Sequence, residues 1–310
     1  MASKNSNVPA IMRQGKFTPW FYLLPALIVM GTFIVYPGIN TFLLSFRNNG
    51  NTGWASTSCV AGQSCWGFLE NFHYALTSQI MQTAFLNNLK WILLMVSGTV
   101  ILGLLIAVLA DRVKYEPIAK SIIFLPMAIS FVGAGVIWKF MYNFGTGDVQ
   151  IGLLNALIVS LGGKPVSFLT VPQLNTVALI IVGVWMWTGF CMTILAAALK
   201  SVSTEILEAA RVDGASEWMV FYKIMVPQIM PTITVVVTTM VINVLKIFDI
   251  VYVMTGGNYG TDVIANRMYK EMYSMFNTGR AAAIAIVLIL VIVPAMIFNI
   301  RRFRMQESER

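Results

Sequence analysis

Apolar residues in this chain gather into long runs that short polar segments separate. Residues 17–46 contain no charged side chain, and neither do residues 91–110 or 174–199. A helix needs about 20 consecutive apolar residues to cross the hydrocarbon core of a bilayer. The pattern predicts an all-α membrane protein with six transmembrane helices, at approximately residues 18–46, 85–110, 118–142, 174–199, 231–254 and 281–300.

The polar segments divide the chain into one membrane domain and two short tails. We expect an N-terminal tail at residues 1–17, a transmembrane domain at 18–302 and a C-terminal tail at 303–310. The first apolar run is longer than that of a signal peptide and has no small-residue cleavage site, so we expect a retained helix. Residues 47–84 form a predicted polar loop, and the apolar segment 151–161 is too short to span a bilayer.

The composition agrees with lipid as the solvent for much of the chain. Of 310 residues, 57% are hydrophobic and 11% are charged, against about 25% charged in soluble domains. The formal net charge is +8, but the basic residues flank apolar runs and form no stripe with interleaved aromatic rings. That arrangement argues against nucleic acid as a partner and fits a lipid bilayer.

The placement of lysine and arginine predicts the orientation of the helices. Six helices put both termini on one side, together with the turn at 111–120 and the charged insert at 200–230. That side carries thirteen of the 21 Lys and Arg residues, and the loops on the opposite side carry four. Because cytoplasmic loops are enriched in these residues, we expect both termini and the insert to be cytoplasmic.

The chain lacks the residue sets that common enzymes and metal sites need. His73 is its one histidine, and no His-Glu-x-x-His sequence occurs. The nearest approach to a phosphate loop, residues 162–164, lacks the opening glycine and is followed by Pro165. We therefore expect no catalytic residue, no bound metal and no bound cofactor in this chain, and a role other than catalysis.

Two of the three cysteines lie in the polar loop that the predicted orientation places outside. Cys59 and Cys65 are close in sequence, and disulfides persist in oxidising compartments. We expect a bridge between them; the alternative is two free thiols. Cys191, within the fourth helix, is interpreted as a small core residue.

The insert between the fourth and fifth helices begins with a predicted short helix. Residues 204–212 place Glu205 and Glu208 in its first turn, where the helix dipole favours acidic side chains. Glu208 and Arg211 are three residues apart, which is a spacing that allows an ion pair on the helix surface.

A turn then leads toward the membrane. Asp213-Gly214 is a turn signal, because glycine readily adopts the left-handed conformation that ends helices. Ser216 is expected to cap a second short helix running to Ile224, and Pro227 marks the approach to the fifth membrane helix. The insert is either a docking element or a solvated amphipathic loop with no partner.

The spacing within the insert resembles a known signature. Glu208-Ala209-Ala210, three residues, Gly214, nine residues and then 224–227 resemble the Glu-Ala-Ala loop of binding-protein-dependent ABC importer permeases, with valine in place of the usual leucine. The chain from 18 to 302 also resembles the carbohydrate-uptake, maltose-transporter-like branch of that family. The segments that carry this wider likeness are 20–26, 124–126, 143–147 and 248–257.

The resemblance implies the permease subunit of a carbohydrate ABC importer, with a cytoplasmic coupling helix between the fourth and fifth transmembrane helices. Its implied partners are a homologous second permease in a heterodimer, two ABC ATPase subunits that use ATP and Mg, and an extracytoplasmic solute-binding protein. The implied location is the cytoplasmic (inner) membrane of a bacterium or archaeon. The residues implied in ATPase coupling are Glu208, Ala209, Ala210, Asp213, Gly214, Ile224 and Pro227.

The family's sugar site, carried onto this chain, implies a pocket midway through the membrane. The implied substrate-binding residues are Met186, Trp187, Phe190, Thr239, Asn243 and Lys246, with Ser130 added from the third helix. Aromatic rings stack on pyranose rings, and amide and hydroxyl groups meet sugar hydroxyls. Alternatively, Trp187 packs between helices, Asn243 bonds neighbouring helices together, and Lys246 neutralises Asp249.

The implied substrate is a di- or oligosaccharide or a glycoside. Alternatives are a glycosidic compatible solute, a polyol or glycerol phosphate, although Lys246 as the pocket's one cation makes the phosphate a poorer fit. A further alternative is an ion-coupled secondary carrier, for which Lys246 and Asp249 are the intramembrane charges available.

Overall fold

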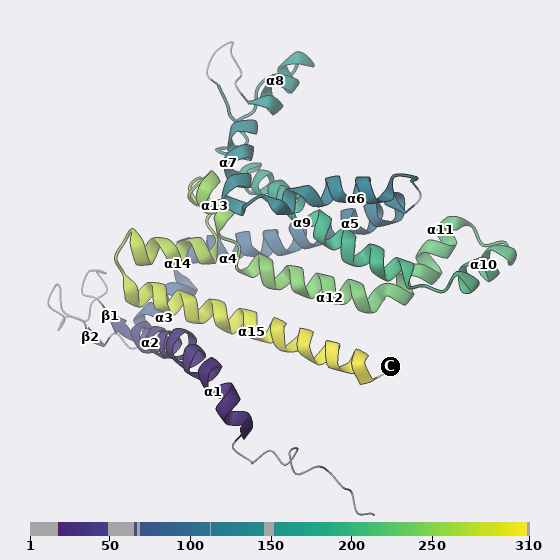
Figure 1. The fold of residues 1–310 in the computed structure, drawn as a ribbon. Helices are drawn as coiled ribbons and strands as arrows, with labels where there is room; N and C mark the ends of the chain where they lie inside the picture. The colour runs from purple at the N-terminus through teal and green to yellow at the C-terminus, as the bar shows by residue number, and fades with distance from the viewer. Residues whose placement is uncertain (1–17, 49–64, 67–68, 112, 146–151, 309–310) are drawn as a thin grey trace, which may run out of the picture.

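The computed structural model describes residues 18–48, 65–66, 69–111, 113–145 and 152–308, and these are helical almost throughout (Figure 1). Within them, five helical stretches are long and apolar enough to cross a membrane, and a bent helix pair makes a sixth if it is counted as one span. The all-α class and the set of apolar spans expected from the sequence are confirmed.

Four of the candidate spans combine several elements, and two are single helices. The first consists of α1 (Thr18–Met30), η2 (Gly31–Val35) and α2 (Tyr36–Ser45), and the second of α4 (Gln79–Trp91), η3 (Ile92–Val96) and α5 (Ser97–Ala110). The bent pair is α6 (Glu116–Phe124) with the 3-10 turn η4 (Leu125–Ala128), and α7 (Phe131–Met141). The fourth span is α9 (Asn175–Lys200), the fifth joins α11 (Glu217–Val220), η5 (Phe221–Met225) and α12 (Val226–Leu245), and the sixth lies in α15 (Thr278–Ser308). The elements η2, η3 and η5 are π-turns inside otherwise continuous helices.

Shorter elements connect the spans. β1 (Arg47–Asn48) and β2 (Cys65–Trp66) pair antiparallel, and the connecting helices are α3 (Glu70–Thr77), α8 (Leu153–Ser160), α10 (Thr204–Val212), α13 (Asp249–Met254) and α14 (Ile264–Tyr273). The interpretation of residues 47–84 as one polar loop is wrong, because α3 and the first turn of the second span lie within it.

The third span is broken, whereas the sequence predicted one helix over residues 118–142. α6 and α7 meet at an angle of 97°, and α7 turns away from the direction of α6 (Figure 1). Pro126 lies in the turn η4 and has no backbone N–H to donate. Ile129 and Ser130 are extended, and Ser130 Oγ accepts a hydrogen bond from Gly133 N at 3.0 Å, which caps α7.

The fifth span begins and ends earlier than the expected 231–254. It is one helix over Glu217–Leu245, so a separate short helix ending at Ile224 does not form. Pro227 lies in the first turn of α12 and Pro231 lies inside it. Membrane helices tolerate proline because neighbouring groups and local π-turns satisfy the freed backbone. The two prolines therefore do not mark the start of the helix.

The remaining bounds lie closer to the expected ones. α9 agrees with the predicted fourth helix to within one residue at each end. α15 continues to Ser308, beyond the expected helix end at residue 300, so residues 303–308 extend the helix and do not form a separate tail. The expected N-terminal tail, residues 1–17, lies outside the described residues.

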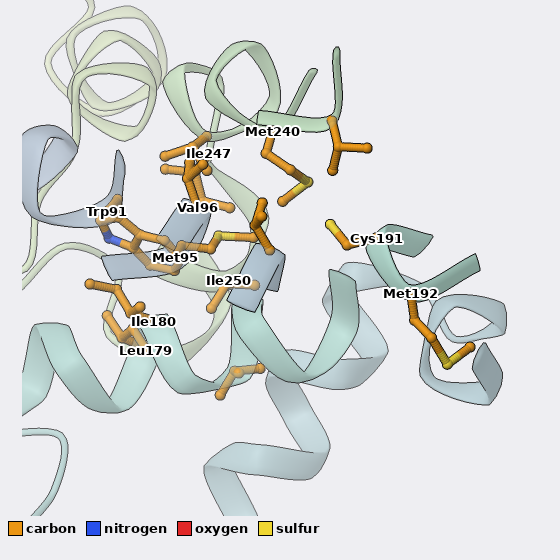
Figure 2. Packing of buried hydrophobic residues seen from close by; sticks show 14 of the residues in the cluster. Trp91, Met95, Val96, Leu179, Ile180, Cys191, Met192, Met240, Ile247 and Ile250 are labelled. Atoms are coloured by element: carbon orange, nitrogen blue, oxygen red, sulfur yellow. The ribbon is translucent and has the colours of Figure 1, made fainter. Parts of the chain in front are cut away.

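The apolar core lies where α9 packs beside η3, α5 and α12. Figure 2 shows Trp91 and Met95 close to Leu179 and Ile180 of α9, with Met240 of α12 nearby. Trp91, Leu179 and Met240 have no exposed surface. The most apolar stretch of the first span, by contrast, has 0% of its residues buried, as expected of a helix that lipid surrounds.

Gly189 allows the third span to lie directly against α9. A Cβ atom at this position would lie 2.6 Å from the carbonyl oxygen of Ile123 and 2.8 Å from Cα of Phe124. Both are backbone atoms, so only glycine fits without a shift of one helix. The contact fixes the end of α6 beside the middle of α9 and thereby sets where α7 begins.

Candidate functional site

A small cavity lies where α9, the start of α7 and the break after α12 meet. It has a volume of about 130 Å³ and combines aromatic, amide and charged side chains. Its lining consists of Met95, Phe131, Trp187, Asn243, Lys246, Ile247, Phe248 and Asp249. Three of the seven implied substrate-binding residues, Trp187, Asn243 and Lys246, therefore share one cavity.

The break between α12 and α13 brings two charges to this cavity. At the end of α12, Lys246 N donates to Asn243 O at 3.2 Å, which tightens the last turn. Phe248 then departs from helical geometry, with φ −141° and ψ −60°, and Asp249 begins α13. The expectation that Lys246 and Asp249 lie inside a continuous fifth helix is therefore wrong.

Lys246 and Asp249 remain separate charges. The Lys246 side chain is exposed and that of Asp249 is half-buried. Among the residues that the structure describes, no salt bridge joins the two. The structure thus does not support mutual neutralisation, and both groups can hydrogen-bond a ligand in the cavity.

Aromatic rings form one wall of the cavity. Phe131, the first residue of α7, stacks on Trp187 with ring centroids 5.9 Å apart and an interplanar angle of 25°. Phe190 meets Trp187 edge-on, at 5.5 Å and 88°. Flat apolar ring faces next to the amide of Asn243 suit a ligand that has both an apolar face and polar edges.

The other four implied residues lie outside the cavity lining. Met186 is 2% exposed and points into the protein interior. Ser130 is exposed, and its hydroxyl caps α7. Thr239 is half-buried, and its carbonyl accepts a hydrogen bond from Asn243 Nδ2 at 3.0 Å. Phe190 contacts the wall only through Trp187.

Four lining residues, Met95, Phe131, Ile247 and Phe248, were not expected from the sequence. Phe131 follows the break in the third span, and Phe248 directly precedes Asp249. In both cases the available signal is an aromatic residue next to a helix break. Met95 belongs to η3 in the second span, and no local pattern connects it with α9.

Side-chain amides hold the loop after α13 in place. Asn87 Nδ2 donates to the carbonyl oxygens of Gly260 at 2.6 Å and Asp262 at 2.9 Å. Asn175 Nδ2 donates to the carbonyl oxygen of Tyr259 at 2.7 Å. Because these amides belong to α4 and α9, the loop is fixed to both helices.

Tyr74 of α3 hydrogen-bonds a buried ion pair of α14 and so joins the two helices. Arg267 and Glu271 pair across one turn of α14, with side chains 10% and 0% exposed. Tyr74 of α3 donates to Glu271 Oε1 at 2.6 Å and accepts from Arg267 Nη2 at 2.8 Å. Burial and the hydrogen bond to Glu271 raise the pKa of Tyr74. Burial lowers the pKa of Arg267, but Glu271 and Tyr74 raise it by more, so the pKa is raised overall.

At the opposite end of the helices, α10 occupies the predicted residues Thr204–Val212. Gly214 has φ +81°, in the left-handed region. Gly214 N donates to Arg211 O at 3.0 Å, and Ala215 N donates to Ala210 O at 3.0 Å. These two bonds make a Schellman motif, which satisfies the last carbonyls of the helix.

Arg211 pairs with Glu217, and the expected pair with Glu208 does not form. Its Nε lies 2.7 Å from Glu217 Oε1, and this hydrogen bond raises the pKa of Arg211. Ser216 Oγ caps α11 by accepting from Met219 N at 3.3 Å, as expected. Of the residues implied in coupling, Ala210 and Ile224 are half-buried, and the exposed ones are Glu208, Ala209, Asp213, Gly214 and Pro227.

A cluster of ion pairs lies at the base of this insert. Lys200, at the end of α9, is 2.5 Å from Glu116 and 3.5 Å from Asp111. Lys120 also pairs with Glu116, at 2.5 Å. A cavity of about 410 Å³ is lined by residues of this cluster and of α10, including Arg211. The cluster ties together the near ends of α5, α6 and α9.

The expected disulfide lies outside what the structure describes. Cys59 is not among the described residues, and only the backbone of Cys65 is, in β2. Cys191 is fully buried in α9, as expected of a core residue.

Comparison with known proteins identifies the family. The model of the family described as binding-protein-dependent transport system inner membrane component matches residues 98–301. The chain belongs to this family. The matched region includes α9, α10 and α12, so the resemblance drawn from the Glu-Ala-Ala loop is confirmed.

The permease has close relatives among curated proteins. It is 51% identical over 290 residues to the osmoprotective compounds uptake permease protein GgtC of Synechocystis sp., which covers 93% of this chain and 100% of that protein. It is 43% identical over 303 residues to the alpha-glucoside transport system permease protein AglF of Rhizobium meliloti, with coverage of 97% and 85%.

The fold of the permease also occurs in solved structures. A chain of a bacterial ABC transporter involved in the import of the acidic polysaccharide alginate matches with a TM-score of 0.74, 22% identity and coverage of 94% of this chain and 96% of that chain. The likeness establishes a shared fold. The permease is therefore a membrane transport subunit with several apolar helices and the fold of ABC importer permeases.

Proposed function

We propose that this permease is the membrane-spanning subunit of an ATP-driven, binding-protein-dependent importer for a neutral di- or oligosaccharide or glycoside. The observation that carries the proposal is the cavity in which the stacked rings of Phe131 and Trp187 lie beside the side chains of Asn243, Lys246 and Asp249. Ring faces bind the apolar face of a pyranose, and the polar groups meet its hydroxyls. The alpha-glucoside system of the relative AglF supports this substrate class.

The size of the cavity supports a second permease as a partner. Its volume of about 130 Å³ is well below the roughly 300–1,000 Å³ of pockets that enclose a drug-sized ligand. A disaccharide therefore needs walls that this chain does not supply. A homologous permease, paired with this one as a heterodimer, would complete the site.

The exposed insert supports separate ATPase subunits as the source of energy. α10 and the C-terminus lie at one end of the molecule, and β1, β2 and α14 lie at the other (Figure 1). In the proposed orientation α10 and both termini are cytoplasmic, and α10 is the coupling helix. Glu208 contacts an ABC ATPase, Gly214 shapes the turn, and ATP and Mg are bound by two such ATPase subunits. The opposite end receives the sugar from an extracytoplasmic binding protein.

A glycosidic compatible solute is the second candidate substrate, because the 51% identical relative is named for the uptake of osmoprotective compounds. Glycerol phosphate fits less well, since the carboxylate of Asp249 in the same cavity would repel a phosphate. An ion-coupled carrier is not proposed, because the chain belongs to a family of binding-protein-dependent systems.

The test is uptake by the complete importer in proteoliposomes, with Trp187→Ala compared with Trp185→Ala. Trp185 packs against Trp138 at 5.6 Å and does not line the cavity. We expect Trp187→Ala to lower uptake by about two- to tenfold, the loss of one aromatic contact, while ATPase subunits still co-purify. Trp185→Ala should transport as the parent does.

Two results would contradict the proposal. Uptake by the parent that continues without ATP or without the binding protein would remove the importer assignment. Equal uptake by the Trp187→Ala variant and the parent would show that Trp187 packs between helices and does not contact substrate.

A further inference from the structure

Four aromatic rings form a continuous row that begins at the cavity. Phe248 lines the cavity and stacks on Tyr252, with centroids 5.1 Å apart and an interplanar angle of 21°. Tyr269 contacts both rings, at 5.1 Å from Phe248 and 5.0 Å from Tyr252. Tyr273 lies 4.8 Å beyond Tyr269. We call these four residues the ring row.

The ring row depends on two helices that face each other. Phe248 and Tyr252 are four residues apart at the start of α13, and Tyr269 and Tyr273 are four apart on α14. Side chains at this spacing lie on the same face of a helix, so each helix contributes two neighbouring rings. Both helices lie outside the long apolar spans, at the end of the fold opposite α10 (Figure 1).

The four rings differ in exposure, and the last one, Tyr273, is the most exposed. Phe248 and Tyr269 are half-buried, Tyr252 is 44% exposed and Tyr273 is 62% exposed. A purely structural aromatic cluster would bury its ring faces, since burial of apolar area is what such a cluster contributes. The row instead leaves ring surface open from the cavity to the end of α14.

The ring row is held rigidly by the polar contacts around it. The loop between α13 and α14 is fixed by the amides of Asn87 and Asn175. Helix α14 is fixed to α3 by the hydrogen bonds of Tyr74 with Glu271 and Arg267. Rigid placement lowers the entropy cost of binding a ligand. The rings are thus placed in advance and need not be ordered by a ligand.

We propose that the ring row is a path of sugar-stacking subsites along which a neutral glycoside passes from the outer end of the permease to the cavity. Each ring offers an apolar face to a pyranose, and the three tyrosine hydroxyls offer hydrogen bonds to its hydroxyls. The row carries no ionised group at neutral pH, which favours a neutral sugar over an acidic one. This inference rests on the proposed function.

The experiment compares ring-deleting and ring-keeping variants in the reconstituted importer. Tyr252→Ala and Tyr273→Ala are assayed beside Tyr252→Phe and Tyr273→Phe, with radiolabelled trehalose, maltose and sucrose as probes. Tyr36→Ala is the control, because Tyr36 is an exposed tyrosine on α2, 69% exposed against 62% for Tyr273, and is not one of the four rings of the row. Sugar uptake and ATP hydrolysis are measured on the same vesicles.

We expect each alanine variant to lower the sugar imported per ATP hydrolysed by about two- to tenfold, because ATP is still hydrolysed when the sugar is captured less often. The phenylalanine variants should regain most of this ratio, and Tyr36→Ala should keep the parental ratio. A packing role or a role in the aromatic belt at the membrane interface would instead lower the amount of assembled protein and leave the ratio unchanged.

The outcomes separate this inference from the proposed function. If the parent imports none of the three sugars, the proposed function fails, and the ring row fails with it. If the parent imports a sugar and both alanine variants keep the parental ratio, the ring row alone is overturned. A ratio lowered equally in Tyr36→Ala would also overturn it.

Discussion

Removal of the Glu271 carboxylate should destabilise the end of the permease formed by α3 and α14 more than any surface change. Glu271 Oε1 accepts hydrogen bonds from the Tyr74 hydroxyl and from Arg267, and the Glu271 side chain is 0% exposed. Glu271→Ala leaves the guanidinium of Arg267, which is 10% exposed, without its counter-ion. Breaking a buried pair by removing one partner costs about 3–5 kcal/mol. Two lost charge-assisted hydrogen bonds at about 1.5–3 kcal/mol each give the same scale.

The free energy of unfolding can be measured by SDS titration in mixed micelles, with intrinsic tryptophan fluorescence as the signal. The matched control is Glu205→Ala, because Glu205 is exposed on α10 and a surface change of this kind should cost within about 0.5 kcal/mol. The double variant Arg267→Met, Glu271→Leu removes both charges and replaces them with apolar side chains. We expect it to be more stable than Glu271→Ala.

Non-additivity is the decisive observation for this pair. Residues in one hydrogen-bonded network couple by about 0.5–3 kcal/mol. If the double variant loses as much stability as the sum of Arg267→Met and Glu271→Leu measured alone, the two side chains do not act as a buried pair. If Glu271→Ala lowers the free energy of unfolding by no more than Glu205→Ala does, the magnitude derived from the burial of Arg267 and Glu271 is refuted.

The remaining predictions concern α10 and Tyr74. Gly214→Asp places a non-glycine side chain at φ +81°, which costs about 1–2 kcal/mol. We expect the variant to insert into the membrane normally, but to lose uptake and to co-purify less with the ATPase. Normal uptake by this variant would show that Gly214 has no role in coupling. Burial and the hydrogen bond to Glu271 raise the pKa of Tyr74 in the folded protein above its ordinary value of 10.0. The stability that the protonated hydroxyl contributes is therefore complete below pH 10 and is lost as the pH rises through the raised pKa. Melting temperatures from pH 8 to 12 should therefore fall more steeply for the parent than for Tyr74→Phe, and parallel curves would contradict this.

Local features were well predicted from the sequence. The end of α10 at Gly214 follows from a helix-ending glycine, and the start of α11 follows from the serine cap at Ser216. Both are interactions between near neighbours in the chain. The pairing of Arg211 was wrong for a related reason. Spacing on one helix favoured Glu208, but the Schellman turn folds α11 back so that Glu217 is nearer.

Breaks in the membrane helices were not predicted, because hydropathy reports how apolar a segment is and not how straight it is. The bend at Pro126 lies inside an uninterrupted apolar run, and the end of α12 before Lys246 is equally hidden. The cavity depends on both breaks, since they place Phe131 and Phe248 beside Trp187. The resemblance to the permease family implied three of the lining residues, Trp187 on α9, Asn243 on α12 and Lys246 directly after α12.

The buried network of Tyr74, Arg267 and Glu271 could not have been inferred from sequence. Tyr74 and Arg267 are separated by 193 residues, and each lies in a segment that reads as polar and exposed. Helices α3 and α14 both pack against α15 and exclude water from the site. Because a buried charge needs a partner, Arg267 requires a counter-ion there.

The 97° bend of the third span divides its two halves between different neighbours. α6 packs along α9 and is tied to it through Glu116 and Lys200, whereas α7 packs against α13. A straight rod would transmit a displacement of the α10 end unchanged in direction. Across the 97° bend, the axis of α6 does not point along α7, and Ile129 and Ser130 are extended between the two helices. This two-residue link is therefore the covalent path by which a movement of α6 would reach α7 and Phe131 at the cavity.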